Sequence, residues 1–598
     1  AASATYNQGG TGASSRTVEN KLQESISVKD FGAVGDGVTD DTAAIQAALL
    51  VSAGKTLHLV KGETYLISTT TGLVVSANGS ALTGGGKLLA SNSTNHLIYI
   101  TGNDCSIENI ELEGDGTFLS TTTPDDDRIA LIKVAGERCS IRGNKLTNAR
   151  QNFIHFNNVS SGEASHNKIL GGITSYTSSD TYYQGIRASD CSNLIITNNL
   201  IEAIGTGKVA EGIDVVASDL GINGGHLIDS NIIKDAHDHG IYLDFAYGCS
   251  LTNNITYSDS AGIVCSSKFD TTLVTEYAGN VCDGNIINAT TGSVAGNSGI
   301  HLRDCNNSSC TDNTVFGFSR GISILPVSYS DANLTLSNNV ISNNSIKNFT
   351  HYGIIISAAG NTVGSVEGNI ITSNSLEGEG DSSGVGISCV FSTGILNANK
   401  FNDNIIRECG DVGITSGFDS NSSYSGNIII NPAVSGGTEK CGIFVLDGVG
   451  LSIESNTIVD NLGTPAMLYG ISGNNDSDQC TIRDNIIKNA QTVGIRRFQY
   501  SGHKNSFSGN KTGSDPLQGV VTLTASNLTT ITNDNINVAG GYTSYVLLMP
   551  VEQTAATLQA GTNHTFVTAS DHTANTSFKI RGLGAAAGTE QFFYNIVQ

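Results

Sequence analysis

The sequence predicts an all-β protein whose main body is a parallel β-helix, and three observations support this prediction. A Gly-Ile dipeptide recurs along the chain with an average spacing of about 28 residues, which is a solenoid period. Hydrophobic blocks of strand length, rich in Ile and Val, surround these dipeptides and leave no room for a helix between them. Asn, Asp, Ser and Gly fill the turns. The dipeptides begin at Gly185, Gly212, Gly240, Gly262, Gly299, Gly321, Gly353, Gly386, Gly413, Gly442, Gly470 and Gly494.

A second mark shows that each repeat holds at least two short strands. An Asn followed two residues later by Ile, Leu or Val precedes the later dipeptides. Short strands of this kind can bury their apolar sides only when one coil stacks on the next. The marks are Asn199, Asn231, Asn253, Asn285, Asn313, Asn344, Asn374, Asn404, Asn427, Asn456 and Asn485.

Composition agrees with tightly turned coils and excludes several classes of partner. The 598 residues include 70 Gly, 6 Pro and no Trp. The net charge of -23 argues against nucleic acid or an anionic membrane surface as a partner. No stretch of about 18 consecutive apolar residues is present, so no membrane insertion is expected.

The cysteines are expected to be reduced core residues. There are twelve, and several occupy one place in the repeat, each followed by Ser or Thr. A recurring small apolar residue at one place is most simply a thiol stacked in the core. The chain has no Cys-x-x-Cys or His-Glu-x-x-His spacing, so we predict no metal site and no cofactor.

The first 70 residues are predicted to lead into the coils and to cap them. Residues 1–27 form a polar lead-in, and we expect the chain to be a piece of a longer protein. Residues 28–70 hold a short helix, with Thr39 as the N-cap and Gly54 as the stop, followed by the first strands. This helix is expected to cover the open end of the first coil. Its first turn carries Asp40 and Asp41, and its apolar stripe is Ala44, Ile45, Ala48 and Leu49.

The same region carries a resemblance to known proteins. DFGAVGDGVTDDTAAIQAAL (residues 30–49) resembles the motif that opens the β-helix of the pectate-lyase-like superfamily. YNQGGTGASSRTVENKLQESISVK (residues 6–29) resembles the lead-in to that motif in bacteriophage tailspikes, and TLHLVKGETYLI (residues 56–67) resembles the first strands. The resemblance implies a right-handed β-helix and a capsule-degrading tailspike, located on the virion tail and acting at the host cell surface. The source that it implies is an Acinetobacter phage.

The coils are predicted over residues 71–512 and a different domain over residues 513–598. In the latter, SYVLLMPVEQ, HTFVTA, SFKIRG and EQFFYNIVQ are expected to form strands. This part resembles the small β-rich module that holds phage tail proteins together as homotrimers. The apolar FFYNIV near the chain end also requires burial, so we predict a homotrimer.

The phase of the Gly-Ile marks separates inward from outward positions. If Ile points inward, the second and fourth residues after Gly point outward. The inward positions are then small or apolar, and the outward positions between residues 180 and 305 are rich in chemically useful groups, whereas later coils place Ser323, Ile355, Ser388, Thr415 and Phe444 there. The inward set is Ala188, Val215, Leu243, Cys265 and Leu302; the outward sets are Arg187, Asp214, Tyr242, Val264 and His301, and Ser189, Val216, Asp244, Ser266 and Arg303.

Glycoside hydrolysis needs two carboxyl groups, and the outward sets offer them. Asp214 and Asp244 lie on adjacent coils, offset by two residues, so their Cα atoms are expected about 8 Å apart. Glu211 is the third catalytic candidate. This spacing leaves both the retaining and the inverting course open. The predicted substrate-binding residues, with Tyr to stack on sugars and Arg to hold a carboxylate, are Tyr182, Tyr183, Arg187, His239, Tyr242, His301 and Arg303.

A second-choice site lies in the inserted turn SLEGEGDSSG, with Glu377, Glu379 and Asp381, which could complete a groove between subunits. For every one of these residues the alternative is a structural role: solvent-facing charge, rim packing, or neutralisation of a neighbour. The expected function is endolytic cleavage of a bacterial surface polysaccharide, capsular or exopolysaccharide, by hydrolysis. The alternatives are a polysaccharide lyase acting by β-elimination and a non-catalytic adhesin that binds glycan.

Overall fold

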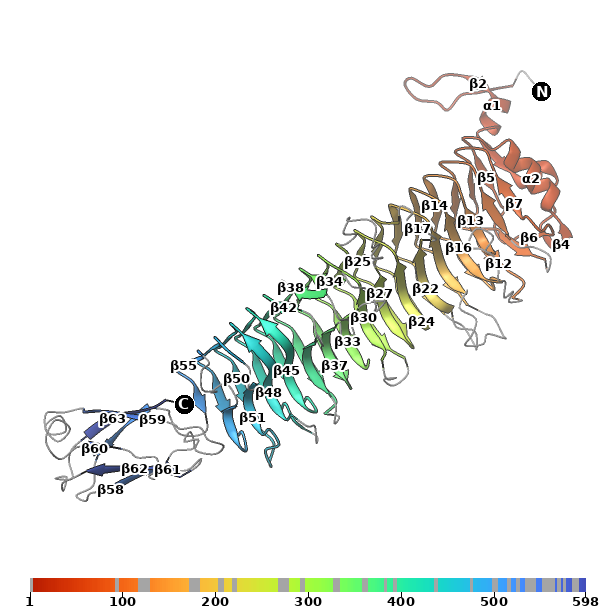
Figure 1. Cartoon of the computed structure of the whole chain (residues 1–598). Helices are drawn as coiled ribbons and strands as arrows, with labels where there is room; N and C mark the ends of the chain where they lie inside the picture. Colours follow the sequence, from red (N-terminus) through yellow and green to blue (C-terminus); the bar gives the residue numbers. More distant parts are fainter. Residues whose placement is uncertain are drawn as a thin grey trace. The chain divides into compact units, whose positions relative to one another are not determined.

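The computed structural model divides the chain into two compact units, unit 1 (residues 1–315) and unit 2 (residues 316–598). In each unit short strands stack side by side (Figure 1). No helix in the described part of the chain is long and apolar enough to span a membrane. The structure describes residues 4–91, 96–116, 129–171, 183–202, 209–217, 223–266, 279–290, 296–325, 334–357, 364–380, 384–390, 395–434, 439–473, 477–496, 504–512, 518–522, 528–532, 545–550, 565–566, 572–573, 577–582 and 591–597.

Each coil of unit 1 contributes one strand to each of three parallel sheets. The strand that begins at the Gly-Ile mark pairs in parallel with the same strand of the next coil, and the two following strands do likewise. The parallel β-helix is thus confirmed, with three strands in a coil. The Gly-Ile sheet comprises β7 (Leu73–Val75), β10 (Ile98–Ile100), β13 (Ala130–Val134), β16 (Asn152–Asn157), β19 (Gln184–Ser189), β22 (Val209–Val216), the second half of β24 (Ile232–Asp244), β27 (Ala261–Ser266) and β30 (Ser298–Arg303).

The other two sheets of unit 1 follow in chain order within each coil. The middle sheet comprises β3 (Ser25–Ser27), β5 (Thr56–His58), β8 (Ala81–Thr83), β11 (Ser106–Glu108), β14 (Cys139–Arg142), β17 (Gly162–Ser165), β20 (Leu194–Thr197), β23 (Leu227–Asp229), β25 (Ser250–Thr252), β28 (Val281–Asp283) and β31 (Ser309–Thr311). The Asn sheet, which follows the Asn marks, comprises β4 (Asp36–Asp40), β6 (Thr64–Ile67), β9 (Lys87–Ala90), β12 (Glu111–Glu113), β15 (Lys145–Thr147), β18 (Lys168–Leu170), β21 (Leu200–Glu202), the first half of β24, β26 (Ile255–Ser258) and β29 (Ile286–Ala289).

Unit 2 continues the same repeat in its own coils. Its Gly-Ile strands are β33 (Arg320–Leu325), β37 (Tyr352–Ser357), β41 (Val385–Val390), β45 (Val412–Ser420), β48 (Cys441–Val449), β51 (Tyr469–Gly473) and β54 (Val493–Arg496). In the first coils of unit 2 an additional strand follows the Gly-Ile strand. These additional strands are β34 (Leu334–Ser337), β38 (Gly364–Glu367) and β42 (Ile395–Asn397). The Asn strands are β36 (Ser345–Phe349), β40 (Ser375–Gly378), β44 (Ile405–Arg407), β47 (Ile428–Ile430), β50 (Thr457–Val459), β53 (Ile486–Lys488) and β56 (Lys511–Thr512).

Parallel pairing ends at β56, and the strands that follow pair antiparallel. One sheet joins β57 (Gln518–Thr522), β63 (Gln591–Val597) and β59 (Tyr545–Pro550), and another joins β58 (Leu528–Thr532), β62 (Ser577–Gly582), β60 (Thr565–Phe566) and β61 (His572–Thr573). Each of the four predicted strand segments contains one of these strands. The predicted boundary at residue 513 stays a prediction, because the division into compact units falls at residue 315 instead. In a solenoid each coil contacts mainly its neighbours, so compactness alone does not mark its end.

Close stacking explains why Gly precedes Ile in the coils that carry the Gly-Ile mark. A Cβ atom on Gly185 would lie 2.6 Å from the carbonyl oxygen of Gly212 in the next coil, and 2.9 Å from Cγ2 of Ile201. Gly240 meets the carbonyl oxygen of Gly262 at the same distance. The position therefore excludes any side chain, and Ile then fills the core behind it.

The Asn marks form a hydrogen-bonded ladder inside the coils. In unit 1, Nδ2 of Asn199 donates to Oδ1 of Asn231 at 2.9 Å and to the Ala164 carbonyl at 2.8 Å. The backbone N–H of Asn199 donates to the same Oδ1 at 3.0 Å. The mark at Asn253 is wrong by one residue: Asn254 joins the ladder, and Asn253 occupies the left-handed turn before it, with φ 53°. The ladder of unit 1 is Asn144, Asn167, Asn199, Asn231, Asn254, Asn285 and Asn313.

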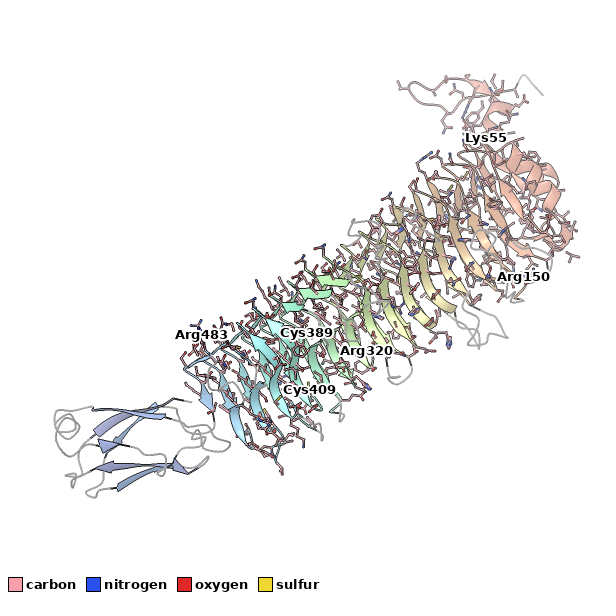
Figure 2. The ribbon with its side chains drawn as sticks, in the orientation of Figure 1. Lys55, Arg150, Arg320, Cys389, Cys409 and Arg483 are labelled. Atoms are coloured by element: carbon pink, nitrogen blue, oxygen red, sulfur yellow. The ribbon has the colours of Figure 1, made fainter. Side chains whose placement is uncertain are left out.

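All twelve cysteines lie among the described residues, each is buried, and none forms a disulfide, as predicted. Cys389 and Cys409 are labelled in Figure 2. Burial raises the pKa of the Cys191 thiol to about 12 and that of Cys480 to about 11. The thiols of Cys191 and Cys480 therefore stay protonated and serve as small core residues.

The capping helix begins later than predicted. A short helix α1 (Val18–Leu22) and a 3-10 turn (Val28–Phe31) precede it, and the helix itself, α2, spans Thr42–Leu50 with Asp41 as its N-cap. Thr39 belongs to β4, because the Asp41 carboxylate accepts from the backbone N–H groups of Val34 and Gly35 and holds the chain extended up to that point. Of the predicted stripe, Ile45, Ala48 and Leu49 are buried.

The predicted capping role of the helix is confirmed by the amide of Gln46. Its Nε2 donates to the Val74 carbonyl at 2.9 Å, and its Oε1 accepts from the Val74 N–H at 2.8 Å. Val74 lies in β7, an early strand of the Gly-Ile sheet. The side chain therefore takes the place of a neighbouring strand, so these backbone groups of β7 are satisfied.

We predict that Asn231→Ala destabilises unit 1. The change removes the acceptor of Asn199 and the donor to the Ile196 carbonyl, and each buried group left without a partner costs about 1–3 kcal/mol. Urea unfolding followed by circular dichroism should show a lower midpoint. Asn288→Ala, on the outward side of β29, is the matched control and should leave the midpoint unchanged. Equal midpoints for both variants would contradict a stabilising ladder.

Candidate functional site

Two rows of side chains run along the outer face of the Gly-Ile sheet in unit 1, in the register that the sequence predicts. The predicted inward residues between them have no exposed surface. The phase of the repeat is therefore confirmed. One row is Arg187, Asp214, Tyr242, Val264 and His301, and the other is Ser189, Val216, Asp244, Ser266 and Arg303.

The first part of this face, which we call the buried half, consists of His155, Arg187, Ser189 and Asp214. Arg187 and Asp214 form an ion pair, with only 4% and 2% of their side chains exposed. Nε of Arg187 also donates to Oγ of Ser189 at 3.1 Å, and Nε2 of His155 lies 3.0 Å from the same oxygen. These side chains mainly satisfy one another, as buried charges must.

Burial corrects two of the predicted roles. Asp214 was predicted to be a catalytic carboxylate and Arg187 to hold a sugar carboxylate, and both roles require contact with a substrate from solvent. In the structure the two groups neutralise each other out of reach of solvent. The alternative role, in which each charge neutralises its neighbour, fits their position.

The second part of the face, which we call the accessible half, is partly open to solvent. The rings of His239 and Tyr242 stack with centroids 5.0 Å apart and planes 25° apart. The Arg303 guanidinium carbon lies 5.9 Å from the Tyr242 ring centre, and Nε of Arg303 donates to Nδ1 of His301 at 3.4 Å. The members of the accessible half are Glu211, Asp238, His239, Tyr242, Asp244, His301 and Arg303.

Asp244 is a partly buried carboxyl group of this half. Burial raises its pKa above the ordinary 3.8, and a hydrogen bond from Ser266 and the charge of Arg303 offset part of that rise. Glu211 adds to the rise through its negative charge. Asp244 therefore keeps its proton to a higher pH than an exposed aspartate does, which is the property of a proton donor.

Glu211 is the second carboxyl group of the accessible half. Its Oε2 accepts from Nε2 of Gln184 at 2.9 Å, which leaves Oε1 directed toward His239, whose Nδ1 is 3.6 Å away. Glu211 and His239 face each other in register on β22 and β24. The structure thus brings Glu211, His239, Tyr242, Asp244, His301 and Arg303 together, as predicted.

The two tyrosines before Gly185, Tyr182 and Tyr183, are not part of the accessible half as the structure describes it. Tyr182 lies outside the described residues. Tyr183 has no exposed surface, and its ring packs 5.6 Å from the ring of Phe153 at an interplanar angle of 53°. The prediction that Tyr183 stacks on sugars is therefore wrong, because its ring belongs to the core.

The second-choice site lies in unit 2 and has the character of solvent-facing charge. Glu377 stands in register between Lys347 and Arg407 on neighbouring strands. It forms an ion pair of 3.7 Å with Lys347, and about half of each side chain is exposed. Glu379 follows β40, and Asp381 lies outside the described residues.

Two residues of the face were missed by sequence reasoning. His155 precedes Arg187 in the outward row, but its coil begins with Phe153 and Ile154 instead of Gly-Ile. Alignment on the Ile alone would have found it. Asp238 lies where β24 passes from the Asn sheet to the Gly-Ile sheet, and no repeat rule places a side chain at such a bend.

Comparison with known families identifies the class of protein. Residues 220–401 and 380–536 match the family described as the right handed beta helix region, which together is more than half of the chain. The chain therefore belongs to the right-handed β-helix family. Residues 98–277 also match the family described as the periplasmic copper-binding protein NosD, which is less than half of the chain.

Individual relatives match short segments of the chain, and one of them is a phage protein. A segment of 67 residues is 48% identical to a capsule-specific depolymerase of Klebsiella phage K5-2, covering 10% of this chain and 8% of the relative. Another of 44 residues is 59% identical to a mannuronan C5-epimerase of Azotobacter vinelandii, covering 7% of this chain and 4% of the relative. The matched segments thus span less than a tenth of the length of these relatives.

Among solved structures, the tailspike protein of E. coli bacteriophage HK620 aligns with a TM-score of 0.50 and 12% identity, over 100% of this chain and 98% of the other. At this identity the likeness shows the fold. The predicted right-handed β-helix is thereby confirmed. The Acinetobacter source stays a prediction.

We predict that Asp214→Asn destabilises unit 1 strongly, because it removes the negative charge that pairs with the buried Arg187 guanidinium. Breaking one side of a buried ion pair costs about 3–5 kcal/mol. Thermal unfolding should show a clear drop in melting temperature. The double variant Arg187→Met with Asp214→Leu removes both charges and should recover most of that loss. A single variant as stable as the native chain would contradict the buried pair.

Proposed function

We propose that the chain is a phage tailspike depolymerase that binds a bacterial surface polysaccharide, capsular or exopolysaccharide, and cleaves it endolytically by hydrolysis. The observation that carries the proposal is Asp244, a partly accessible carboxyl group with a raised pKa, beside an aromatic pair and an arginine. The names of the relatives support the substrate class. One is a capsule-specific depolymerase, and a variant of the HK620 tailspike has been determined in complex with a hexasaccharide.

In the proposed reaction Asp244 is the general acid. Its proton passes to the glycosidic oxygen as the bond from the anomeric carbon to that oxygen breaks, and water adds to the anomeric carbon. Glu211 is the second accessible carboxylate; it lies beside the attacking water and accepts the proton that this water loses. Asp214 acts indirectly, because its ion pair with Arg187 holds the neighbouring strand surface in place.

The aromatic and cationic groups account for binding. The edges of the stacked His239 and Tyr242 rings offer a platform for a sugar ring. Arg303 carries a positive charge on a chain with a net charge of -23, so it is suited to an acidic sugar. A local positive charge of this kind allows a protein with a net negative charge to bind a negatively charged polymer.

The lyase alternative has one observation in its favour. His301 and Arg303 are hydrogen-bonded neighbours, and β-elimination uses a base together with a cation that neutralises a uronate carboxylate. Unsaturated ends that absorb ultraviolet light in the digest would select this reaction over hydrolysis. A polymer of unchanged size after incubation would select the non-catalytic adhesin.

The homotrimer and the location on the virion tail, acting at the host cell surface, belong to the same proposal. They rest on the resemblance and on the antiparallel strands after Gln518. Light scattering at micromolar concentration should give three times the chain mass of 62.1 kDa. A monomer mass would contradict the homotrimer.

We predict that Asp244→Asn lowers the rate of polymer cleavage roughly 10²-fold or more, the usual contribution of a general acid, while binding persists. Size analysis of purified capsular polysaccharide measures cleavage, and sedimentation with the polymer measures binding. Glu377→Gln, at an exposed carboxylate of unit 2, is the matched control and should leave both unchanged. Full activity of Asp244→Asn with loss in Glu377→Gln would move the site to unit 2.

The pH profile gives a separate prediction. The acid form of Asp244 is the active one, so activity is present below its raised pKa and is lost as the pH rises through it. Arg303 holds that pKa down, so Arg303→Gln should move the alkaline limb of kcat/KM to higher pH, whereas Arg303→Lys should leave it in place. An alkaline limb that is identical in the two variants would argue against Asp244 as the donor.

A further inference from the structure

Three side chains of the accessible half converge on one point. Glu211, Asp238 and His239 each direct a ligand atom into the same space, and these atoms lie within 4.8 Å of one another. Nδ1 of His239 is 3.6 Å from Oε1 of Glu211 and 3.4 Å from Oδ2 of Asp238. A nitrogen flanked by two carboxylate oxygens is a set of ligands that divalent metals accept.

The nitrogen at the centre of this group makes no hydrogen bond within the described part of the chain, although it is buried. Both separations are longer than an N–H···O hydrogen bond, which spans about 2.7–3.2 Å. They match the distance between two ligand atoms of a tetrahedral metal centre, about 3.3–3.6 Å for metal–ligand bonds of about 2.0–2.2 Å. The two separations from the His239 nitrogen are therefore those of ligand atoms that share one ion.

Neighbouring groups hold the three ligands in place. Gln184 donates to Oε2 of Glu211 and so directs Oε1 inward, and the Tyr242 ring stacks on the imidazole of His239. Contacts of this kind orient metal ligands in proteins. Glu211 and His239 have only 13% and 12% of their side chains exposed, whereas Asp238 has 40% exposed. Glu211 and His239 are thus held by neighbouring side chains, whereas Asp238 is open to solvent.

The fold explains how two consecutive residues serve one site. Successive side chains of a straight strand point to opposite faces. Asp238 and His239 lie where β24 leaves its pairing with β26 and takes up its pairing with β27. The register of β24 with β22 is irregular between Ala236 and His239. Residues 237–239 are all partly exposed instead of alternating, so both side chains reach the same side.

We propose that Glu211, Asp238 and His239 bind one divalent transition-metal ion, such as Zn²⁺ or Mn²⁺, and leave coordination positions open for water or a sugar oxygen. One imidazole and two carboxylates favour these ions over Ca²⁺ and Mg²⁺, which prefer oxygen ligands alone. An ion in this place lies beside the rings of the accessible half. It could lower the pKa of bound water or neutralise a sugar carboxylate.

The role of the ion in catalysis rests on the proposed function, but its binding does not. Zn²⁺ binding can be measured without any polysaccharide, so the two proposals fail separately. A chain that binds Zn²⁺ and leaves the polymer intact keeps the metal site and loses the depolymerase. A chain that cleaves polymer and binds no Zn²⁺ loses the metal site alone.

The experiment is calorimetric titration of Zn²⁺ into the full chain after treatment with a chelator. We expect one ion per chain, with affinity reduced at least about tenfold in Glu211→Gln and in His239→Ala, and to a smaller extent in Asp238→Asn. His237→Ala is the matched control, because His237 lies on the same strand but contacts Asp259 and should leave the affinity unchanged. Mg²⁺ at the same concentration should not displace the ion.

Thermal unfolding provides a second readout that also shows whether each variant is folded. A ligand that binds only the folded chain raises its melting temperature. Zn²⁺ should raise the melting temperature of the native chain and of His237→Ala, and should not raise that of His239→Ala. No saturable binding to the native chain, or an equal rise in all three, would overturn the proposal.

Discussion

The close approach of successive coils is the constraint on which the rest of this protein depends. Parallel strands lie about 4.8 Å apart, so whatever occupies one place in a coil meets the same place in the next. At the Gly-Ile mark no side chain fits, since a Cβ on Gly185 would strike the Gly212 carbonyl. At the Asn mark a polar group must be buried, and it is satisfied because the next coil supplies Asn231 to Asn199. The column of Gly residues and the Asn ladder are both consequences of stacking, and together they fix the register of the strands that form the outer face.

That register gives the outer face two different environments. Arg187 and Asp214 stand on neighbouring strands and form a buried pair, whereas one coil further on Tyr242 and Asp244 reach partly into solvent. The carboxyl groups of the face consequently differ: the carboxylate of Asp214 is neutralised by a guanidinium, while partial burial raises the pKa of Asp244. Two carboxyl groups on neighbouring coils of the same face therefore differ in environment: Asp214 is held in a buried ion pair, and Asp244 has a raised pKa.

Much of the fold and part of the candidate site could be predicted from local rules, and the failures have physical reasons. Alternation along a strand and the spacing of the marks place Tyr242, Asp244 and Arg303 on one face. The same alternation does not show which outward positions are covered by other parts of the chain. Arg187 and Asp214 are therefore predicted from the sequence to contact substrate, although both are buried. The helix start was misjudged because the carboxylate of Asp41 is engaged by the backbone of Val34 and Gly35. Tyr183 resembles a surface aromatic in sequence, and only its packing against Phe153 places it in the core.

The sequence by itself determined the repeat, the presence of at least two short strands in each coil, the buried thiols and the phase that separates inside from outside, because each depends on neighbours within one period. Tertiary structure decided which outward groups remain accessible and which charges pair. It also decided how Glu211 meets Asp238 and His239, where no metal-binding spacing exists in the sequence. That meeting depends on the bend of β24 and on the stacking of one coil on another, and neither is visible in the order of residues along a single strand.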